Sequence, residues 1–284
     1  MYRVRIAYNQ LQYQQSRTQL LQSQDSVFDD LIKVNEIRYR VGQISSLEKL
    51  NGISQYKRIQ YSLKISRSEL RNAKYQFNLL IGRPNDTTYI PGDVLRKSNY
   101  VFEITPVDTA YISGNPLLDY SNQQEGYSRN LLKVERRRRI PGAVVGFLNQ
   151  GNASTPLTPR LRLGITLPIW QWTYQANINA AKKGIEIAQT QKKLTGYQLY
   201  TEYAKAQADF RQYRDNLIYF ETIALPEAAE ILRNARESFR LGSINYYQYL
   251  QNVELSYTLR QNYLETLRNY NQSHINLIYL KGDY

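Results

Sequence analysis

Apolar residues recur at steps of three and four along two parts of the chain, which is the spacing of one face of an α-helix. The first series is Tyr56, Ile59, Leu63, Ser66, Leu70, Ala73, Phe77 and Leu80. The second is Ser256, Leu259, Tyr263, Thr266, Tyr270, Ser273, Leu277 and Leu280, with further apolar residues beside it. The pattern predicts long helices in coiled-coil packing, and a helix that is apolar on two flanks suits a cylinder wall.

The two series belong to copies of one unit, related by a shift of 200 residues. Residues 38–44 recur as 238–244, and without a gap Leu50 falls on Leu250 and Leu80 on Leu280. In each copy a glycine precedes a possible helix cap, Ser45 or Asn245. We therefore expect an internal duplication of antiparallel helical hairpins that turn at the glycines. The alternative is that each glycine is a tolerated residue inside one long helix.

Between residues 141 and 168 the period changes from helix to strand. Four aliphatic residues alternate with polar or small ones: Leu161, Leu163, Ile165 and Leu167. Residues 143–148 are a plausible partner strand, joined to the first by the polar loop 149–156. Trp170 and Trp172 follow where interface aromatics of a membrane strand are placed. Taken alone, the pattern also fits an amphipathic hairpin that covers a soluble core.

A hairpin that crosses a lipid bilayer cannot leave the backbone groups of its strand edges without hydrogen bonds. Its strand edges must be paired there, so it would have to join other hairpins in a closed barrel built from several chains. After it, residues 171–224 lack proline and predict a very long helix, which we expect Pro226 to interrupt.

Composition excludes several classes of function. Of 284 residues none is Cys and one is His, whereas Lys plus Arg number 37 against 24 Asp plus Glu, for a net charge of +13. Disulfides, thiolate sites and multi-histidine metal centres are therefore excluded. Asp29, Asp30, Glu221 and Glu227 lack a partner that would tune a catalytic acid, and His274 reads as a packing residue. We expect no enzyme activity, no cofactor and no bound metal.

The basic run Arg136–Arg139 raises the question of nucleic-acid binding. Consecutive helical residues point around the axis and do not form one binding face, and no nucleic-acid motif accompanies them. We expect no nucleic-acid partner. No run reaches the roughly 18 apolar residues of a transmembrane helix. The first residues have neither an apolar h-region nor a small-residue cleavage site, so we expect no signal peptide in this chain.

The order of these features resembles the TolC family of outer-membrane efflux channels, over essentially the whole chain. Four motifs carry the likeness: residues 131–141 resemble the entry into the barrel, 164–170 a strand ending in Pro and an aromatic, and 235–242 with 280–282 the last hairpin. The resemblance implies a mainly α fold of long antiparallel helical hairpins, forming an α-barrel tunnel. It also implies a small β-hairpin that contributes to a trimeric transmembrane β-barrel.

The resemblance further implies six segments. They are a first periplasmic helical hairpin (1–82), a connecting equatorial segment (83–116), a helix leading to the barrel (117–139), the transmembrane β-hairpin (140–168), a long tunnel helix (169–225) and a second periplasmic hairpin (226–284). The first copy lacks a counterpart of the residues before 201. We therefore expect an amino-terminal part to be missing, as in a fragment, a truncated gene or the tail of a pump fusion.

For function, the resemblance implies a passive exit duct in a tripartite, RND-type efflux system of a Gram-negative bacterium. The chain would lie in the outer membrane with a periplasmic extension, in contact with lipid. Its partners would be two further copies in a homotrimer, a periplasmic adaptor (membrane fusion) protein and an inner-membrane efflux pump. Small solutes or metal ions are the candidate cargo. The alternative is a soluble coiled-coil scaffold or membrane-surface-binding protein, which would stay soluble without detergent.

Two sets of site residues follow from the resemblance. The adaptor-docking turns are Val41, Gly42, Gln43, Ile44, Leu241, Gly242, Ser243 and Ile244. The candidates for the pore constriction are Glu48, Asn51, Gln248 and Gln251. The positions where the family carries cation-attracting aspartates hold Gln248 and Gln251 here, so we do not expect a strong cation-binding ring.

Overall fold

The computed structural model describes residues 1–84, 94–98, 114–149, 159–169 and 171–281. These residues form five long α-helices, a shorter one, a π-helical turn and two strands. They divide into two compact units, one of residues 1–106 with 203–284 and the other of residues 107–202. The fold is mainly α, as expected from the sequence.

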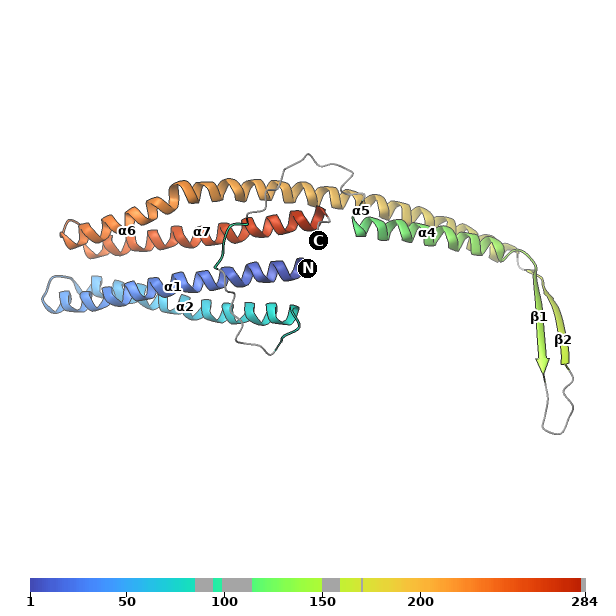
Figure 1. Ribbon diagram of the computed structural model, residues 1–284, viewed down its shortest axis with the longest axis horizontal. Coiled ribbons are helices and arrows are strands. Elements are labelled where there is room, and N and C mark those ends of the chain that lie inside the picture. The colour runs from blue at the N-terminus through green and yellow to red at the C-terminus, as the bar shows by residue number, and fades with distance from the viewer. Residues whose placement is uncertain (85–93, 99–113, 150–158, 170, 282–284) are drawn as a thin grey trace, which may run out of the picture. The chain divides into compact units, whose positions relative to one another are not determined.

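The first unit begins with an antiparallel helical hairpin, in which α1 (Tyr2–Arg40) packs along α2 (Ser46–Leu80) (Figure 1). The helices meet along the seam that the sequence pattern predicts, because Ile59, Leu63 and Phe77 are buried. Gly42 lies between the helices with φ of 74°, so it forms a turn and does not continue one helix.

The second hairpin of this unit consists of α6 (Leu225–Arg240) and α7 (Tyr246–Lys281). It turns at Gly242, whose φ is 75°. The long helix α5 (Gln171–Tyr219) runs into α6 through the π-helical turn η1 (Phe220–Ala224).

The regular α-helix is interrupted just before Pro226, as expected, because α5 ends at Tyr219 and α6 begins at Leu225. The chain nevertheless stays helical between them through the π-helical turn. Proline lacks the N–H of a normal helical hydrogen bond and its ring crowds the preceding turn. Here that turn is wider than an α-turn, since the Leu225 N–H reaches the Phe220 carbonyl oxygen five residues back. Pro226 lies in the first turn of α6, where proline is tolerated.

The two hairpins share one hydrophobic core near their turns. It combines side chains from four helices: Phe28 and Leu31 of α1, Ile59 of α2, Ala235 and Phe239 of α6, and Tyr246, Tyr249, Leu250, Val253 and Tyr257 of α7. The rings of Phe239 and Tyr249 stack with centroids 4.6 Å apart. Because each helix contributes to the same cluster, the two copies of the repeat fold as one body at this end.

Farther from the turns, α1 packs directly against α7. The Asn9 side-chain amide donates to the Arg268 carbonyl oxygen at 3.0 Å, and the Arg268 guanidinium lies 4.6 Å from the ring centre of Tyr13. The rings of Tyr2 and Tyr279 stack at 4.3 Å. These contacts join the copies of the repeat along their length.

A short segment of residues 94–98 lies across these helices. The Leu95 N–H donates to Ser16 Oγ at 3.2 Å, and the Asn271 side chain accepts from the Ser98 N–H at 3.0 Å and donates to the Arg96 carbonyl oxygen at 2.8 Å. His274 is buried and lies 3.0 Å from Ser98 Oγ through its Nδ1. Burial lowers the pKa of His274, which keeps the ring neutral near neutral pH. The histidine is a packing residue that also helps to hold this segment.

The second unit contains α4 (Pro116–Arg137) and the first part of α5, joined through the strands β1 (Gly142–Asn149) and β2 (Pro159–Thr166). Glu125 of α4 connects the two helices, because its carboxylate accepts from Arg129, from Gln189 at 3.2 Å and from Lys192 at 3.3 Å. These donors lower the pKa of Glu125 to about 2, so the carboxylate stays charged in weakly acidic solution.

The strands form a two-stranded antiparallel hairpin, in which Val145 pairs with Leu163 and Phe147 with Leu161. Paired residues of antiparallel strands lie on the same face, so the aliphatic face of β2 continues on β1. Within the described part of the chain, no helix combines the length and the apolar character needed to cross a bilayer.

Candidate functional site

Two backbone hydrogen bonds close the turn of the first hairpin, and their donors are Gly42 and Gln43. The Gln43 N–H donates to the Arg38 carbonyl oxygen at 2.9 Å, and the Gly42 N–H donates to the Tyr39 carbonyl oxygen at 3.1 Å. This is the Schellman arrangement, which requires a left-handed residue at Gly42. A Cβ there would meet no atom within 4 Å, so the backbone angle alone explains the glycine.

The second turn repeats this geometry. The Ser243 N–H donates to the Ser238 carbonyl oxygen at 2.8 Å, and the Gly242 N–H donates to the Phe239 carbonyl oxygen at 3.2 Å. The duplication that the sequence predicts therefore extends to individual hydrogen bonds of the turns.

Each turn ends in a reciprocal cap of the following helix. Ser45 Oγ accepts from the Glu48 N–H at 3.2 Å while the Glu48 carboxylate accepts from the Ser45 N–H at 2.8 Å. In the second copy, the Asn245 side chain accepts from the Gln248 N–H at 2.8 Å, and the Gln248 side chain accepts from the Asn245 N–H at 3.0 Å. The caps predicted at Ser45 and Asn245 are confirmed.

The four residues expected at the pore constriction lie in the first two turns of α2 and α7. Glu48 and Gln248 lie at the third position of their helices, and both side chains are held by the caps. Asn51 is half-buried and Gln251 is exposed, one turn farther along each helix. The four residues occupy equivalent places in the two copies.

The surfaces of both turns are apolar and exposed. Val41 is 63% exposed and Leu241 is 67% exposed, whereas Ile44 and Ile244 are half-buried. Leu47, in the first turn of α2, is 68% exposed and extends the first of these surfaces, a contribution that the sequence analysis missed. The sequence signal for it is an apolar residue two positions after the helix cap Ser45.

Below the turns lies a close contact between the two copies, at Gly52 of α2. A Cβ at this position would come within 2.6 Å of the Asn35 amide nitrogen and 2.7 Å of the Tyr246 hydroxyl. Asn35 and Tyr246 are both almost completely buried, and burial raises the pKa of Tyr246 to about 12. An ion pair between Arg58 of α2 and Glu254 of α7 also joins the copies. The glycine thus allows α7 to approach α2.

The β-hairpin carries the second candidate site. Leu161, Leu163, Ile165 and Leu167 are 64–78% exposed, and their cross-strand partners Val145 and Phe147 are equally open. The sequence analysis missed the last two as members of this face. Trp172 is exposed at the start of α5, whereas Trp170 lies outside the described residues.

Two arginines of the basic run 136–139 contact neighbouring side chains. Arg138 pairs with Glu135 at 2.9 Å, and Arg139 donates to Gln175 Oε1 at 3.3 Å. Elsewhere in the described ranges, no group of three or more His, Asp or Glu side chains is placed to hold a metal ion.

Solved structures share this architecture over almost all of the chain. A membrane protein from Pseudomonas aeruginosa matches 99% of the chain and 67% of its own length, with a TM-score of 0.86 and 16% identity. The CmeC outer membrane channel of Campylobacter jejuni gives 0.80 over 99% and 62%, with 16% identity. The MtrE outer membrane channel of Neisseria gonorrhoeae, in its open state, gives 0.76 over 99% and 65%, with 19% identity.

These likenesses show that the chain has the fold of the TolC-type outer-membrane channels, which confirms at the level of the fold the resemblance carried by the sequence motifs. The chain spans about two thirds of the length of these structures. No protein-family model matches the sequence. A comparison with curated proteins likewise gives no match.

Proposed function

We propose that the chain is a subunit of an outer-membrane channel that serves as the passive exit duct of a tripartite, RND-type efflux system. The observation that carries this proposal is the exposed aliphatic face of the β-hairpin in a chain that otherwise consists of long helical hairpins. Ile165 is 78% exposed and Leu163 72%, which is costly in water and favourable against lipid. The solved channels of the same fold support this interpretation.

In this proposal the helical hairpins extend into the periplasm and three copies complete the barrel and the tunnel. An inner-membrane pump supplies the transport energy, and the duct itself is passive. Small solutes or metal ions are the proposed cargo.

Insertion of the β-hairpin into lipid tests the proposal. The substitution Ile165→Arg places a charge on the aliphatic face and is expected to cost about 2–4 kcal/mol near the middle of a bilayer. Thr166→Arg adds the same side chain one residue away, on the opposite face, and is the matched control. We expect Ile165→Arg to reduce membrane association and single-channel events in planar bilayers, and Thr166→Arg to behave like the wild type.

The opposite result identifies the scaffold alternative. A chain that stays monodisperse without detergent and gives no conductance, with both variants alike, would overturn the channel proposal. Block of the recorded current by multivalent cations tests whether four residues form the pore constriction: Glu48, Asn51, Gln248 and Gln251. A constriction formed by these residues should be blocked only weakly by multivalent cations, because Glu48 is the one ionisable side chain among them.

We also propose that the two turns are the docking sites of the periplasmic adaptor. The apolar surfaces of Val41 and Leu241 support this, since exposed apolar clusters mark protein contacts. The double substitution Val41→Asp with Leu241→Asp is expected to weaken adaptor binding at least tenfold, measured by surface plasmon resonance with a purified adaptor. Val134→Asp, at a similarly exposed apolar residue outside the turns, is the control. Equal binding by both variants would contradict docking at the turns.

A further inference from the structure

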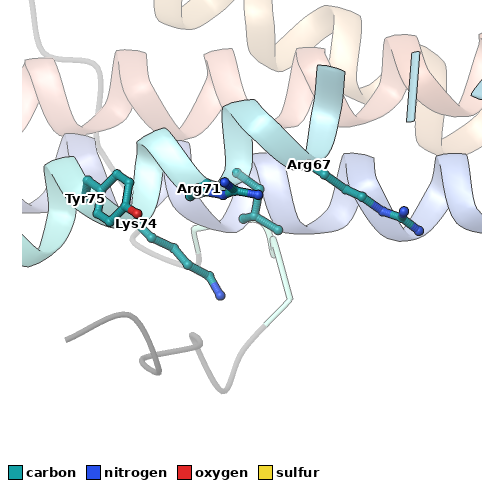
Figure 2. A pocket seen from close by; sticks show the side chains of 5 residues that line it. Arg67, Arg71, Lys74 and Tyr75 are labelled. Carbon is teal, nitrogen blue, oxygen red and sulfur yellow. The ribbon is translucent and has the colours of Figure 1, made fainter. Parts of the chain in front are cut away.

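One side of α2 carries an open groove of about 430 Å³ (Figure 2). The residues that line it follow steps of three and one, so they share one side of the helix: Arg67, Leu70, Arg71, Lys74 and Tyr75. We call this surface the basic groove. Within the described residues, the ion pairs of α2 involve Lys49, Arg58 and Glu69. The three cations of the groove therefore have no carboxylate partner in that part of the chain.

The duplication shows what the equivalent side of α7 contacts. A shift of 200 residues places the groove on Leu267, Tyr270, Asn271, His274 and Ile275. The first four of these are buried. Asn271 binds backbone atoms of Arg96 and Ser98, and His274 lies 3.0 Å from Ser98 Oγ. On this side α7 binds an extended stretch of peptide chain, whereas on α2 Arg67, Arg71 and Tyr75 are exposed.

The two sides differ in the hydrogen bonds that they can make. The Asn271 side chain both accepts from a backbone N–H and donates to a backbone carbonyl oxygen of the segment. Arg71 stands in its place on α2, and a guanidinium can only donate. Lys74 replaces His274, and an ammonium group likewise only donates. A chain that binds to α2 must therefore supply acceptors, which are carbonyl oxygens and carboxylates.

The charge of the bound chain is reversed as well. The segment on α7 is basic, and its Lys97 pairs with Glu221 of η1 at 2.9 Å. The equivalent of Glu221 in the first copy is Leu21, which is buried. The basic groove therefore lacks the acidic residue that balances a basic segment and offers cations in its place.

The groove is long enough for several residues of an extended chain. From Arg67 to Lys74, α2 rises by about 10 Å, which is the length of about three extended residues. Toward the turn, the lining continues with Lys64 of α2 and Asp25 of α1. Asp25 is the one acidic residue among the lining residues of both parts, against four cations. The surface thus stays cationic along its length.

We propose that the basic groove binds an extended acidic segment of a partner protein, in the way that α7 binds residues 94–98. Arg71 and Lys74 hold its carboxylates and carbonyl oxygens through charge-assisted hydrogen bonds, and Leu70 and Tyr75 contact its apolar atoms. The groove begins about 30 Å along α2 from Ser46, so it is separate from the docking turns. The inference goes beyond the channel proposal and does not depend on it.

Two fluorescently labelled peptides test the proposal with the full chain in detergent. One is acetyl-Val-Leu-Arg-Lys-Ser-amide, which has the sequence of residues 94–98, and the other is acetyl-Val-Leu-Glu-Glu-Ser-amide. We expect the acidic peptide to bind at least tenfold more tightly in fluorescence anisotropy, because its carboxylates meet the cations of the groove. Its affinity should fall as salt is added, since these charges are exposed to solvent.

Exchange of two residues between the copies locates the binding. Arg71→Asn with Lys74→His gives the groove the residues of α7, and it should weaken binding of the acidic peptide at least fivefold and abolish the preference over the basic one. Lys182→Asn with Lys183→His makes the same change in net charge at exposed residues of α5 and should bind like the wild type. Circular dichroism verifies that both variants are folded.

Three outcomes would overturn the inference. The wild type could bind both peptides equally or bind neither, which would remove the selectivity for acidic chains. The variant Arg71→Asn with Lys74→His could keep the preference of the wild type, which would place the peptide elsewhere. Inorganic phosphate, at the concentration of the peptide, could displace it completely, which would indicate a site for small anions and not for a peptide chain.

Discussion

Leu250→Ala is expected to destabilise the folded chain by about 2–5 kcal/mol, the cost of emptying a buried leucine site that cannot collapse. Leu250 is completely buried in the core shared by the two hairpins. Its equivalent in the first copy, Leu50, is 60% exposed, so Leu50→Ala should change the free energy of unfolding by no more than about 0.5 kcal/mol. The same substitution at equivalent positions thus separates burial from position in the repeat.

Chemical denaturation of the full chain in detergent measures the difference, with the midpoint and slope of each variant compared with the wild type. Because the two leucines have the same side chain in the same kind of helix, intrinsic helix propensity contributes equally to both variants. Similar losses for Leu50→Ala and Leu250→Ala would show that the core does not have the asymmetry described above.

Gly52→Ala is expected to destabilise the chain by about 1–3 kcal/mol, although alanine is the better helix former. The new Cβ would lie 2.6 Å from the Asn35 amide nitrogen and 2.7 Å from the Tyr246 hydroxyl, closer than non-bonded atoms approach. Both neighbours are buried and have little room to move. The strain should therefore push α2 away from α7 and loosen the contact between the hairpins.

Two glycines of α5 provide the control for this experiment. A Cβ at Gly184 or Gly196 would meet nothing within 4 Å, so alanine there should stabilise the helix by up to about 1 kcal/mol. Adding Tyr246→Phe to Gly52→Ala removes one of the two close atoms and should recover part of the loss. Thermal unfolding followed by circular dichroism gives the sign directly. A Gly52→Ala variant as stable as Gly196→Ala would refute the close contact.

Local sequence signals were sufficient for the helices, the turns and the β-hairpin. The turns at Gly42 and Gly242 depend on residues within one helical turn, and the strand containing Leu161 and Ile165 depends on alternation along itself. The caps at Ser45 and Asn245 are equally local. In each case neighbouring residues determine the structure, so the pattern predicts it.

The sequence analysis did not predict the contacts between residues that are far apart in the sequence. Leu50 and Leu250 occupy the same place in the repeat, and only packing against other helices decides that one is exposed and the other buried. The tight fit at Gly52 depends on Tyr246, almost 200 residues away. Residues 94–98 lack a periodic pattern, yet hydrogen bonds to Ser16 and Asn271 fix their path. Such features need the folded arrangement of both copies.

The π-helical turn at Phe220–Ala224 changes the direction in which the side chains of α6 point around the helix axis, compared with the equivalent part of α1. The equivalent residues of α1 lie in a regular helix, so the two long helices differ here in winding. Each residue advances an α-helix by about 100°, and the wide turn accommodates one residue more than an α-turn, so regular winding of the same residues would rotate α6 by about that angle. Ala235 and Phe239 would then leave the core that they share with α7. The two copies have the same number of residues here, so the wide winding of this turn is a condition for the alignment of the two hairpins, which a comparison of residue identities alone would not reveal.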